Sequence, residues 1–232
     1  MRRPLLLTSL LLAPLLLAAC DAAPADDGLD RHPVLGTCPE DQAASDPFAD
    51  CVDEFLPAGA GFGQDEFPAI VLGPPQAGAD GKGGLDVLSL GCGGQITLRL
   101  DGPGIVDGPG PDLLVFENPF PVGSGTFVEP ARVLVSDDGA DWRAFPCDLD
   151  ADVPRGCAGV ALVRASASND LDPTDPAQAG GDAFDLAALG LARARYVRLI
   201  DVGLEYHGDD TWCTGPSGGF DLDALAAVHA AP

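Results

Sequence analysis

The chain has 232 residues, of which 36 are acidic and 12 are lysine or arginine, so its formal net charge is −24. A surface with this charge repels nucleic acid and anionic lipid headgroups, which argues against a nucleic-acid-binding protein, and it attracts cations. The 30 glycines and 22 prolines favour short elements joined by turns over a mainly helical fold.

The first twenty residues, MRRPLLLTSLLLAPLLLAAC, have the pattern of an export signal. Two arginines precede the apolar segment Leu5–Leu17, which is short for a membrane span. Leu17-Ala18-Ala19-Cys20 looks like a bacterial lipobox, in which the thiol of Cys20 receives a diacylglyceryl group. We therefore expect residues 1–19 to be a lipoprotein signal peptide and the lipid on Cys20 to anchor an exported protein to the bacterial envelope, at the outer membrane or cell surface. The alternative is an ordinary signal peptide cleaved after Ala19.

Seven cysteines are present, and six remain when Cys20 is set aside. An even number in an exported chain indicates three disulfides, although the sequence does not choose among the possible pairings. Short loops favour Cys38–Cys51 and Cys147–Cys157, which leaves Cys92–Cys213. A cysteine metal site is less favoured, because no CxxC pair occurs and the histidines lie near no cluster of cysteines.

Residues 20–60 are rich in Asp, Ala and Pro and lack a sustained hydrophobic period. We expect them to form an acidic tether with a small disulfide loop and a turn of helix at Cys51–Leu56. Residues 61–232 contain short apolar runs between Gly, Pro and Asp turns, which is the spacing of an all-β sandwich. The expected strands are Phe67–Leu72, Leu85–Leu90, Gln95–Leu100, Asp112–Glu117, Ala131–Ser136, Trp142–Pro146, Gly159–Arg164, Arg195–Val202 and Phe220–Val228.

Two details refine this expectation. Gln95–Leu100 alternates between polar and apolar residues, so its even-numbered positions should face the core. Phe184–Leu189 is expected to be one short helical turn, with Asp182 near its start as a candidate cap. The alanine-rich segment Leu222–His229 is compatible with either a strand or a helix.

Four motifs occur in order along the chain: SLGCGGQITL at 89–98, IVDGPGPDLLVFENPF at 105–120, GGDAFDL at 180–186 and GGFDLDA at 218–224. Together they resemble a family of bacterial cell-surface proteins over about residues 61–229. Many members of that family end in an outer-surface sorting tail. No such tail follows residue 229 in this sequence, and we expect the lipid on Cys20 to serve instead.

A second similarity concerns the fold. ARVLVSDDGADW at 131–142 is similar to the strand–turn–strand unit of discoidin-type, galactose-binding-like jelly rolls, and ARYVRL at 194–199 is similar to their later core strand. This resemblance implies a jelly-roll-like antiparallel β-sandwich with long acidic loops. It also implies that the end loops bind a ligand, commonly a glycan and often with a structural Ca²⁺.

Carboxylates recur where the expected elements begin and end, and Ca²⁺ takes six to eight oxygen ligands of this kind. Asp182 and Asp185 are spaced to share a face, and Asp221 and Asp223 alternate along a strand. Without a cation, gathered carboxylates would repel one another and raise one another's pKa. The alternative is that they are separate turn and capping residues. The expected ligands of one Ca²⁺ site are Glu117, Asn118, Asp182, Asp185, Asp201, Asp221 and Asp223.

Other acidic motifs are weaker candidates. Asp101 and Asp107 are explained by the Gly-Pro turns that contain them. The sequence Asp148-x-Asp150-x-Asp152 begins like an EF-hand loop, but Val153 stands where that loop needs glycine.

The loop at 206–212 contains Tyr206, His207 and Trp212, whose rings are candidates for stacking on a sugar face. The alternative for Trp212 is packing beside a Cys92–Cys213 disulfide, and the sequence does not decide between the two. Gly215-Pro-Ser217-Gly-Gly219 matches the G-x-S-x-G hydrolase signature. That elbow needs a buried strand before it and a helix after it, which the neighbouring residues do not suggest.

These observations favour a monomeric, non-enzymatic surface lipoprotein with a Ca²⁺-dependent domain that binds a glycan or a cell-envelope ligand. A structural or assembly lipoprotein that docks a protein partner is the alternative. A hydrolase is less favoured than either.

Overall fold

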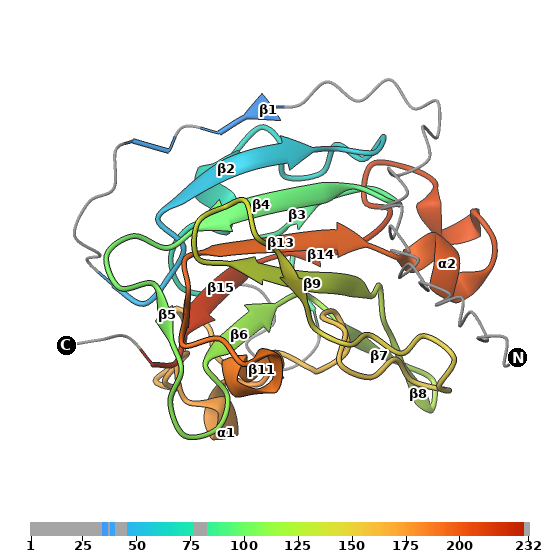
Figure 1. Cartoon of the computed structure of the whole chain (residues 1–232). Helices are drawn as coiled ribbons and strands as arrows, with labels where there is room; N and C mark the ends of the chain where they lie inside the picture. Colours follow the sequence, from blue (N-terminus) through green and yellow to red (C-terminus); the bar gives the residue numbers. More distant parts are fainter. Residues whose placement is uncertain (1–33, 37, 40–45, 77–82, 230–232) are drawn as a thin grey trace, which may run out of the picture. The chain divides into compact units, whose positions relative to one another are not determined.

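The largest sheet of the computed structural model has six antiparallel strands in the order β1-β2-β4-β13-β9-β10 (Figure 1). The structure describes residues 34–36, 38–39, 46–76 and 83–229. The expected signal peptide and Cys20 lie outside these residues. The strands of this sheet are β1 (Val34–Leu35), β2 (Cys51–Leu56), β4 (Gln95–Arg99), β13 (Tyr196–Asp201), β9 (Ala131–Ser136) and β10 (Arg143–Ala144).

The remaining strands form smaller antiparallel units. A three-stranded sheet has the order β11-β6-β15 and lies beneath the large sheet in Figure 1. Three further pairs are β14 with β3, β12 with β5, and the hairpin of β7 with β8. Their bounds are β3 (Leu88–Ser89), β5 (Ile105–Val106), β6 (Leu113–Phe116), β7 (Phe120–Val122), β8 (Gly125–Phe127), β11 (Asp182–Phe184), β12 (Arg193–Ala194), β14 (Asp221–Leu222) and β15 (Ala224–Ala227).

Helical segments are short and lie in the connections. The part of the chain that the structure describes has the α-helices α1 (Pro176–Ala179) and α2 (Gly203–His207) and the 3₁₀ turns η1 (Ala69–Val71), η2 (Leu186–Leu189) and η3 (Thr211–Cys213). Among the described residues, none of the helices has the length and apolar character needed to cross a bilayer. Because the described residues form antiparallel sheets joined by short helical segments, the expected all-β class is confirmed.

The core joins the two layers. Ile96 and Leu98 from the large sheet pack in one buried cluster with Leu113, Val115 and Leu225 from the three-stranded sheet. The even-numbered positions of the segment 95–100 are 0–3% exposed, as the alternation predicts. Burying a Leu or Ile side chain stabilises a fold by about 1.5–3 kcal/mol, so this sandwich-like contact holds the layers together.

The N-terminal part of the described chain differs from expectation. Cys51–Leu56 is strand β2 in the large sheet, not a helical turn, and β1 pairs beside it. The register shifts between Val52 and Glu54, which is a β-bulge that turns both Val52 and Phe55 into the core. Two core-facing residues three positions apart are also typical of a helix, which explains the helical expectation. The expected boundary at residue 61 is also wrong, since the sheet domain already includes Val34.

Two expected strands are absent for visible reasons. In the segment 67–72, Pro68 lacks an amide hydrogen, and the amides of Ile70 and Val71 donate to carbonyls within the same turn. In the segment 159–164, the amides of Val160 and Ala161 donate to the carboxylate of Asp182 and not to a neighbouring strand. The first segment therefore contains the 3₁₀ turn η1, and the second is a loop.

The C-terminal half contains two further differences of detail. The turn after β11 is η2, and its N-cap is Asp185, whose carboxylate accepts from the amide of Ala187. The expected cap, Asp182, lies in β11. The segment 222–229, which was compatible with either a strand or a helix, contains the strand β15.

Three disulfides join the pairs favoured by the sequence, Cys38–Cys51, Cys92–Cys213 and Cys147–Cys157. Cys92–Cys213 spans 121 residues and ties the turn before β4 to η3. Closing a loop of about 100 residues restricts the unfolded chain by about 4–5 kcal/mol in the entropic account. The same bond attaches the loop that carries Trp212 to the turn before β4.

Gly219 supports a testable prediction about this region. It has φ +77°, and a Cβ atom there would lie 2.5 Å from the carbonyl carbon of Gly91. Gly215 has φ +89° but open space around it, so it serves as a matched control. Urea denaturation should show Gly215→Ala losing about 1 kcal/mol of unfolding free energy and Gly219→Ala losing about 3 kcal/mol or more. Equal losses would contradict the close approach of the two backbones.

Candidate metal centre

Three buried carboxylates converge from segments far apart in the sequence. One oxygen each of Glu117, Glu129 and Asp221 lies within 4.8 Å of the others. These residues are 2%, 6% and 7% exposed. Glu117 directly follows β6, Glu129 lies between the β7–β8 hairpin and β9, and Asp221 begins β14. The fold therefore places three negative groups at one buried point.

Acidic side chains accept hydrogen bonds from the backbone amides of the segment that contains Asp221. Three successive amides donate to three different carboxylates: Gly219 N to Glu129 Oε1 at 3.0 Å, Phe220 N to Asp201 Oδ2 at 2.8 Å, and Asp221 N to Glu117 Oε1 at 3.4 Å. When the carboxylates are ionised, such bonds are about twice as strong as neutral ones. They orient the carboxylates and the segment together.

The carboxylate of Glu117 is incompletely satisfied. Its Oε2 is buried and has no hydrogen-bond partner. Among the described residues, no arginine or histidine makes an ion pair with Glu117, Glu129 or Asp221. An unpaired buried charge is strongly destabilising, so this oxygen requires either a proton or a cation.

The raised pKa values of the three carboxyls show that burial and repulsion from neighbouring carboxylates disfavour their ionised forms. Burial, and then the charges of Asp221 and Glu129, raise the pKa of Glu117 well above its ordinary value. Burial, and then Asp221 and Asp201, raise the pKa of Glu129 to about 9. Burial is also the main cause that raises the pKa of Asp221 to about 6. A divalent cation would replace the protons, because it interacts favourably with all three ionised groups.

Four of the other expected metal ligands bind the backbone around the cluster. Asp201 accepts from Gly93 N at 2.7 Å as well as from Phe220 N. Asp182 accepts from Val160 N and Ala161 N, and burial raises its pKa to about 7. The other two expected ligands are Asp223 and Asn118. The carboxylate of Asp223 accepts from Gln76 N, and the side-chain amide of Asn118 donates to the carbonyl of Gly84.

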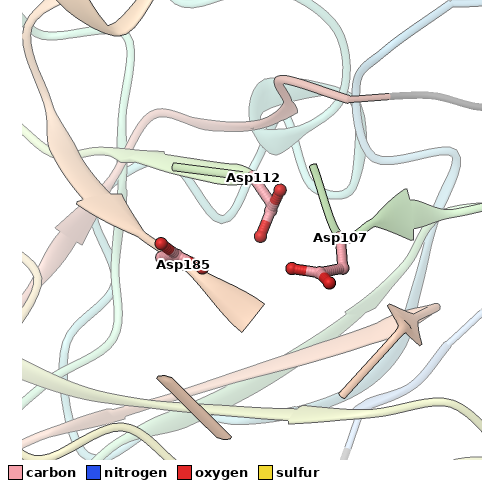
Figure 2. A group of neighbouring side chains, drawn as sticks. All are labelled: Asp107, Asp112 and Asp185. Atoms are coloured by element: carbon pink, nitrogen blue, oxygen red, sulfur yellow. The ribbon is translucent and has the colours of Figure 1, made fainter. Parts of the chain in front are cut away.

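Asp185 lies elsewhere, in a second acidic group with Asp107 and Asp112 (Figure 2). Asp112 is buried, and its two oxygens accept from Gly108 N at 2.8 Å and Leu186 N at 2.7 Å. Asp185 caps η2. Turn and capping bonds account for these two aspartates, so the expectation of a single site containing Asp185 is wrong.

Glu129 is the cluster residue that sequence reasoning missed. It stands two residues before the expected strand 131–136, and Glu117 is the last residue of the expected strand 112–117. A carboxylate at each of these strand ends was the available signal. Only the fold shows that the two ends meet.

Two adjoining hollows open in front of the cluster. The smaller has a volume of about 250 Å³ and is lined by Phe127, Glu129 and Trp212, among others. The larger has a volume of about 580 Å³ and a more apolar lining that includes Phe62, Leu85 and Val87. The residues that line both are Asn118, Phe120, Ser217 and Asp221. Two of the three carboxylates therefore reach the wall of the smaller hollow.

An aromatic group borders the smaller hollow. The rings of Phe127 and Trp212 are 5.1 Å apart, and those of Tyr206 and His207 are 4.8 Å apart. His207 connects the two pairs, with its ring 5.7 Å from that of Trp212. Trp212 lines the hollow and is 48% exposed, whereas the hydroxyl of Tyr206 donates to the carbonyl of Asp152. Of the three expected ligand-binding aromatics, Trp212 is thus the one at the hollow.

Ser217 lies in the loop between η3 and β14. A strand follows it at Asp221, where the hydrolase elbow would have a helix. Ser217 lines both hollows beside the carboxylates. Its position is that of a loop residue at the mouth of the two hollows.

In comparisons with known proteins, no protein-family model matches this chain. No curated protein matches its sequence significantly. The functional conclusion therefore rests on the geometry of the buried carboxylates and the hollows before them.

The raised pKa values predict how stability depends on pH in the absence of a metal ion. Carboxyls of the unfolded chain titrate near pH 4, whereas Asp221 and Glu129 titrate near 6 and 9 in the folded state. The folded protein therefore binds more protons between pH 5 and 8, and its free energy of unfolding should fall as pH rises through this window. Denaturant unfolding with a chelator present measures this trend. A rise in stability from pH 5 to 8 without divalent ions would contradict the clustering of these groups.

Proposed function

We propose that the chain is a surface-exposed, lipid-anchored binding module that takes Ca²⁺ between Glu117, Glu129 and Asp221 and binds a glycan or cell-envelope ligand in the adjoining hollows. The observation that carries this proposal is the unpartnered, buried Oε2 of Glu117 within a carboxylate cluster at the edge of a hollow. A cation at this point would satisfy that oxygen and screen the repulsion among the three groups.

The chemistry of the cluster favours Ca²⁺ over other cations. All three candidate ligands are carboxylates, whereas zinc sites are built mainly from cysteine and histidine. Mg²⁺ demands near-ideal octahedral geometry and gives up its water reluctantly, while Ca²⁺ accepts irregular sets of oxygen ligands. Carboxylates from three segments far apart in the sequence form such an irregular set.

The proposed setting is the bacterial envelope. The lipobox sequence at Leu17–Cys20 supports lipidation of Cys20, and three disulfides suit an oxidising compartment. We further infer that the two-layered β-fold is a galactose-binding-like jelly roll, on the similarity of residues 131–142 and 194–199 to that fold. Its loops would then present the hollows to ligands outside the cell.

Thermal unfolding of the full chain tests the ion. Ca²⁺ at about 100 times its Kd should add about 2.7 kcal/mol to the unfolding free energy, and a chelator should remove this gain. For a domain of this size, that is an increase in Tm of about 5–10 °C. An unchanged Tm in Ca²⁺ and in chelator would remove the metal from the account.

The Glu117→Gln variant distinguishes loss of Ca²⁺ binding from loss of stability. The substitution removes a buried charge while keeping the side-chain shape, so at pH 8 without Ca²⁺ the variant should be at least as stable as the natural protein. With Ca²⁺ its Tm should not rise. Glu205→Gln is the matched control, because Glu205 is exposed and pairs with Arg132, and it should keep the full Ca²⁺ response. A Glu117→Gln variant that responds to Ca²⁺ like the natural protein would place the ion elsewhere.

A glycan array tests the ligand. The full chain, held in a detergent without a sugar headgroup, should bind a subset of glycans in Ca²⁺ and lose them in chelator. An array that stays blank in Ca²⁺, with Ca²⁺ stabilisation intact, would contradict the glycan assignment and leave the ion in place.

A further inference from the structure

The cluster lies at the wall of the smaller hollow and not behind it. Glu129 lines the smaller hollow, and Asp221 lines both hollows. Glu117 completes the cluster from the buried end of β6, where it is 2% exposed. An ion held by all three would have protein oxygens on its inner side and the hollow on its outer side.

Half of the oxygens of the three carboxylates already accept hydrogen bonds. Each carboxylate already uses one oxygen in a hydrogen bond: Glu117 Oε1 with Asp221 N, Glu129 Oε1 with Gly219 N, and Asp221 Oδ1 with the hydroxyl of Ser89. About three unengaged oxygens remain, whereas Ca²⁺ takes about six to eight. Because Glu129 and Asp221 line the smaller hollow, the coordination positions that these carboxylates leave open would face it.

We propose that the ligand itself fills these positions: two adjacent hydroxyl oxygens of a sugar coordinate the ion directly, and the apolar face of the sugar ring packs on Trp212. This inference rests on the proposed Ca²⁺ site and assigns the ion a direct role in recognition. An ion that only orders the loops would make no contact with the ligand.

Trp212 has the position that such a ligand requires. Its ring lies 5.1 Å from that of Phe127 and 5.7 Å from that of His207, so two neighbouring rings hold it, yet it is 48% exposed. A sugar ring has hydroxyls at its edge and C–H groups on its face, which match an ion and an aromatic ring on adjacent walls. The volume of about 250 Å³ is just below that of pockets for drug-sized molecules, which suits a single sugar residue.

Charge decides between a neutral sugar and an anionic ligand. Three ionised carboxylates around a divalent ion leave a net negative charge at the site, and the whole chain carries −24. A carboxylate or phosphate ligand would be repelled, whereas hydroxyl groups bring oxygen ligands without charge. We therefore assign the site to a neutral sugar with adjacent hydroxyls.

The test replaces Ca²⁺ with Eu³⁺ in the full chain, held in a detergent without a sugar headgroup. Luminescence lifetimes in H₂O and D₂O count the water molecules bound to the ion, and Glu117→Gln supplies the baseline for ions bound elsewhere on the acidic surface. The ion at the cluster should carry at least about two waters. Saturating methyl α-D-mannopyranoside, methyl β-D-galactopyranoside or methyl α-L-fucopyranoside should displace about two of them, one per hydroxyl oxygen.

The outcomes separate the two claims. An ion without bound water, or waters that none of the three glycosides displaces, overturns direct coordination and leaves the Ca²⁺ site standing. No Eu³⁺ signal above the Glu117→Gln baseline overturns the Ca²⁺ site and this inference together. Displacement that persists with analogues lacking one of the paired hydroxyls overturns the assignment to adjacent hydroxyls.

The two tryptophans provide a matched pair of variants. Trp212→Ala should lower the affinity for the glycoside about tenfold and leave the affinity for Eu³⁺ unchanged, because the ring contacts the sugar and not the ion. Trp142→Ala should change neither affinity, since Trp142 lies under the guanidinium of Arg198. Equal effects of the two substitutions on glycoside binding would contradict the stacking role of Trp212.

Discussion

The candidate site depends on buried carboxylates that accept hydrogen bonds from the backbone segment Gly219–Asp221. Three consecutive amides of this segment donate to Glu129, Asp201 and Glu117, which come from three other parts of the chain. Because the three amides are consecutive, the carboxylates that accept from them lie close to one another. The hydrogen bonds thus gather negative charge that would otherwise repel, and the fold tolerates this only with a proton or a cation at the unsatisfied oxygen of Glu117.

This constraint links the disulfide, the loops and the proposed recognition surface. The backbone of Gly219 lies against Gly91 beside Cys92, and Cys92 is bonded to Cys213 next to Trp212. The ring of Trp212 and the carboxylates of Glu129 and Asp221 therefore line one hollow as parts of one connected framework. A cation bound there would strengthen the geometry of the hollow as well as offer coordination positions to a ligand.

Local patterns predicted much of the sheet, and long-range packing decided the rest. The alternation in β4 and the short apolar run between turns at β9 indicated both strands. The bulge in β2 broke that alternation and imitated helical spacing. In the candidate site, Glu117 and Asp221 were predictable as acids at strand ends. The meeting of Glu129 with them was not, since it depends on how the β7–β8 hairpin leads into β9. Asp185 was misassigned because a capping aspartate and a metal ligand look alike in a sequence.

The central claim is that Glu117, Glu129 and Asp221 share one Ca²⁺ ion. The most direct measurement is a crystal structure grown in Ca²⁺, with anomalous diffraction to locate the ion. The account predicts a peak about 2.3–2.6 Å from oxygens of all three carboxylates, with the outer side of the ion facing the smaller hollow. A map without an ion at the cluster, in which Glu117 has instead found a hydrogen-bond partner for Oε2, would contradict it.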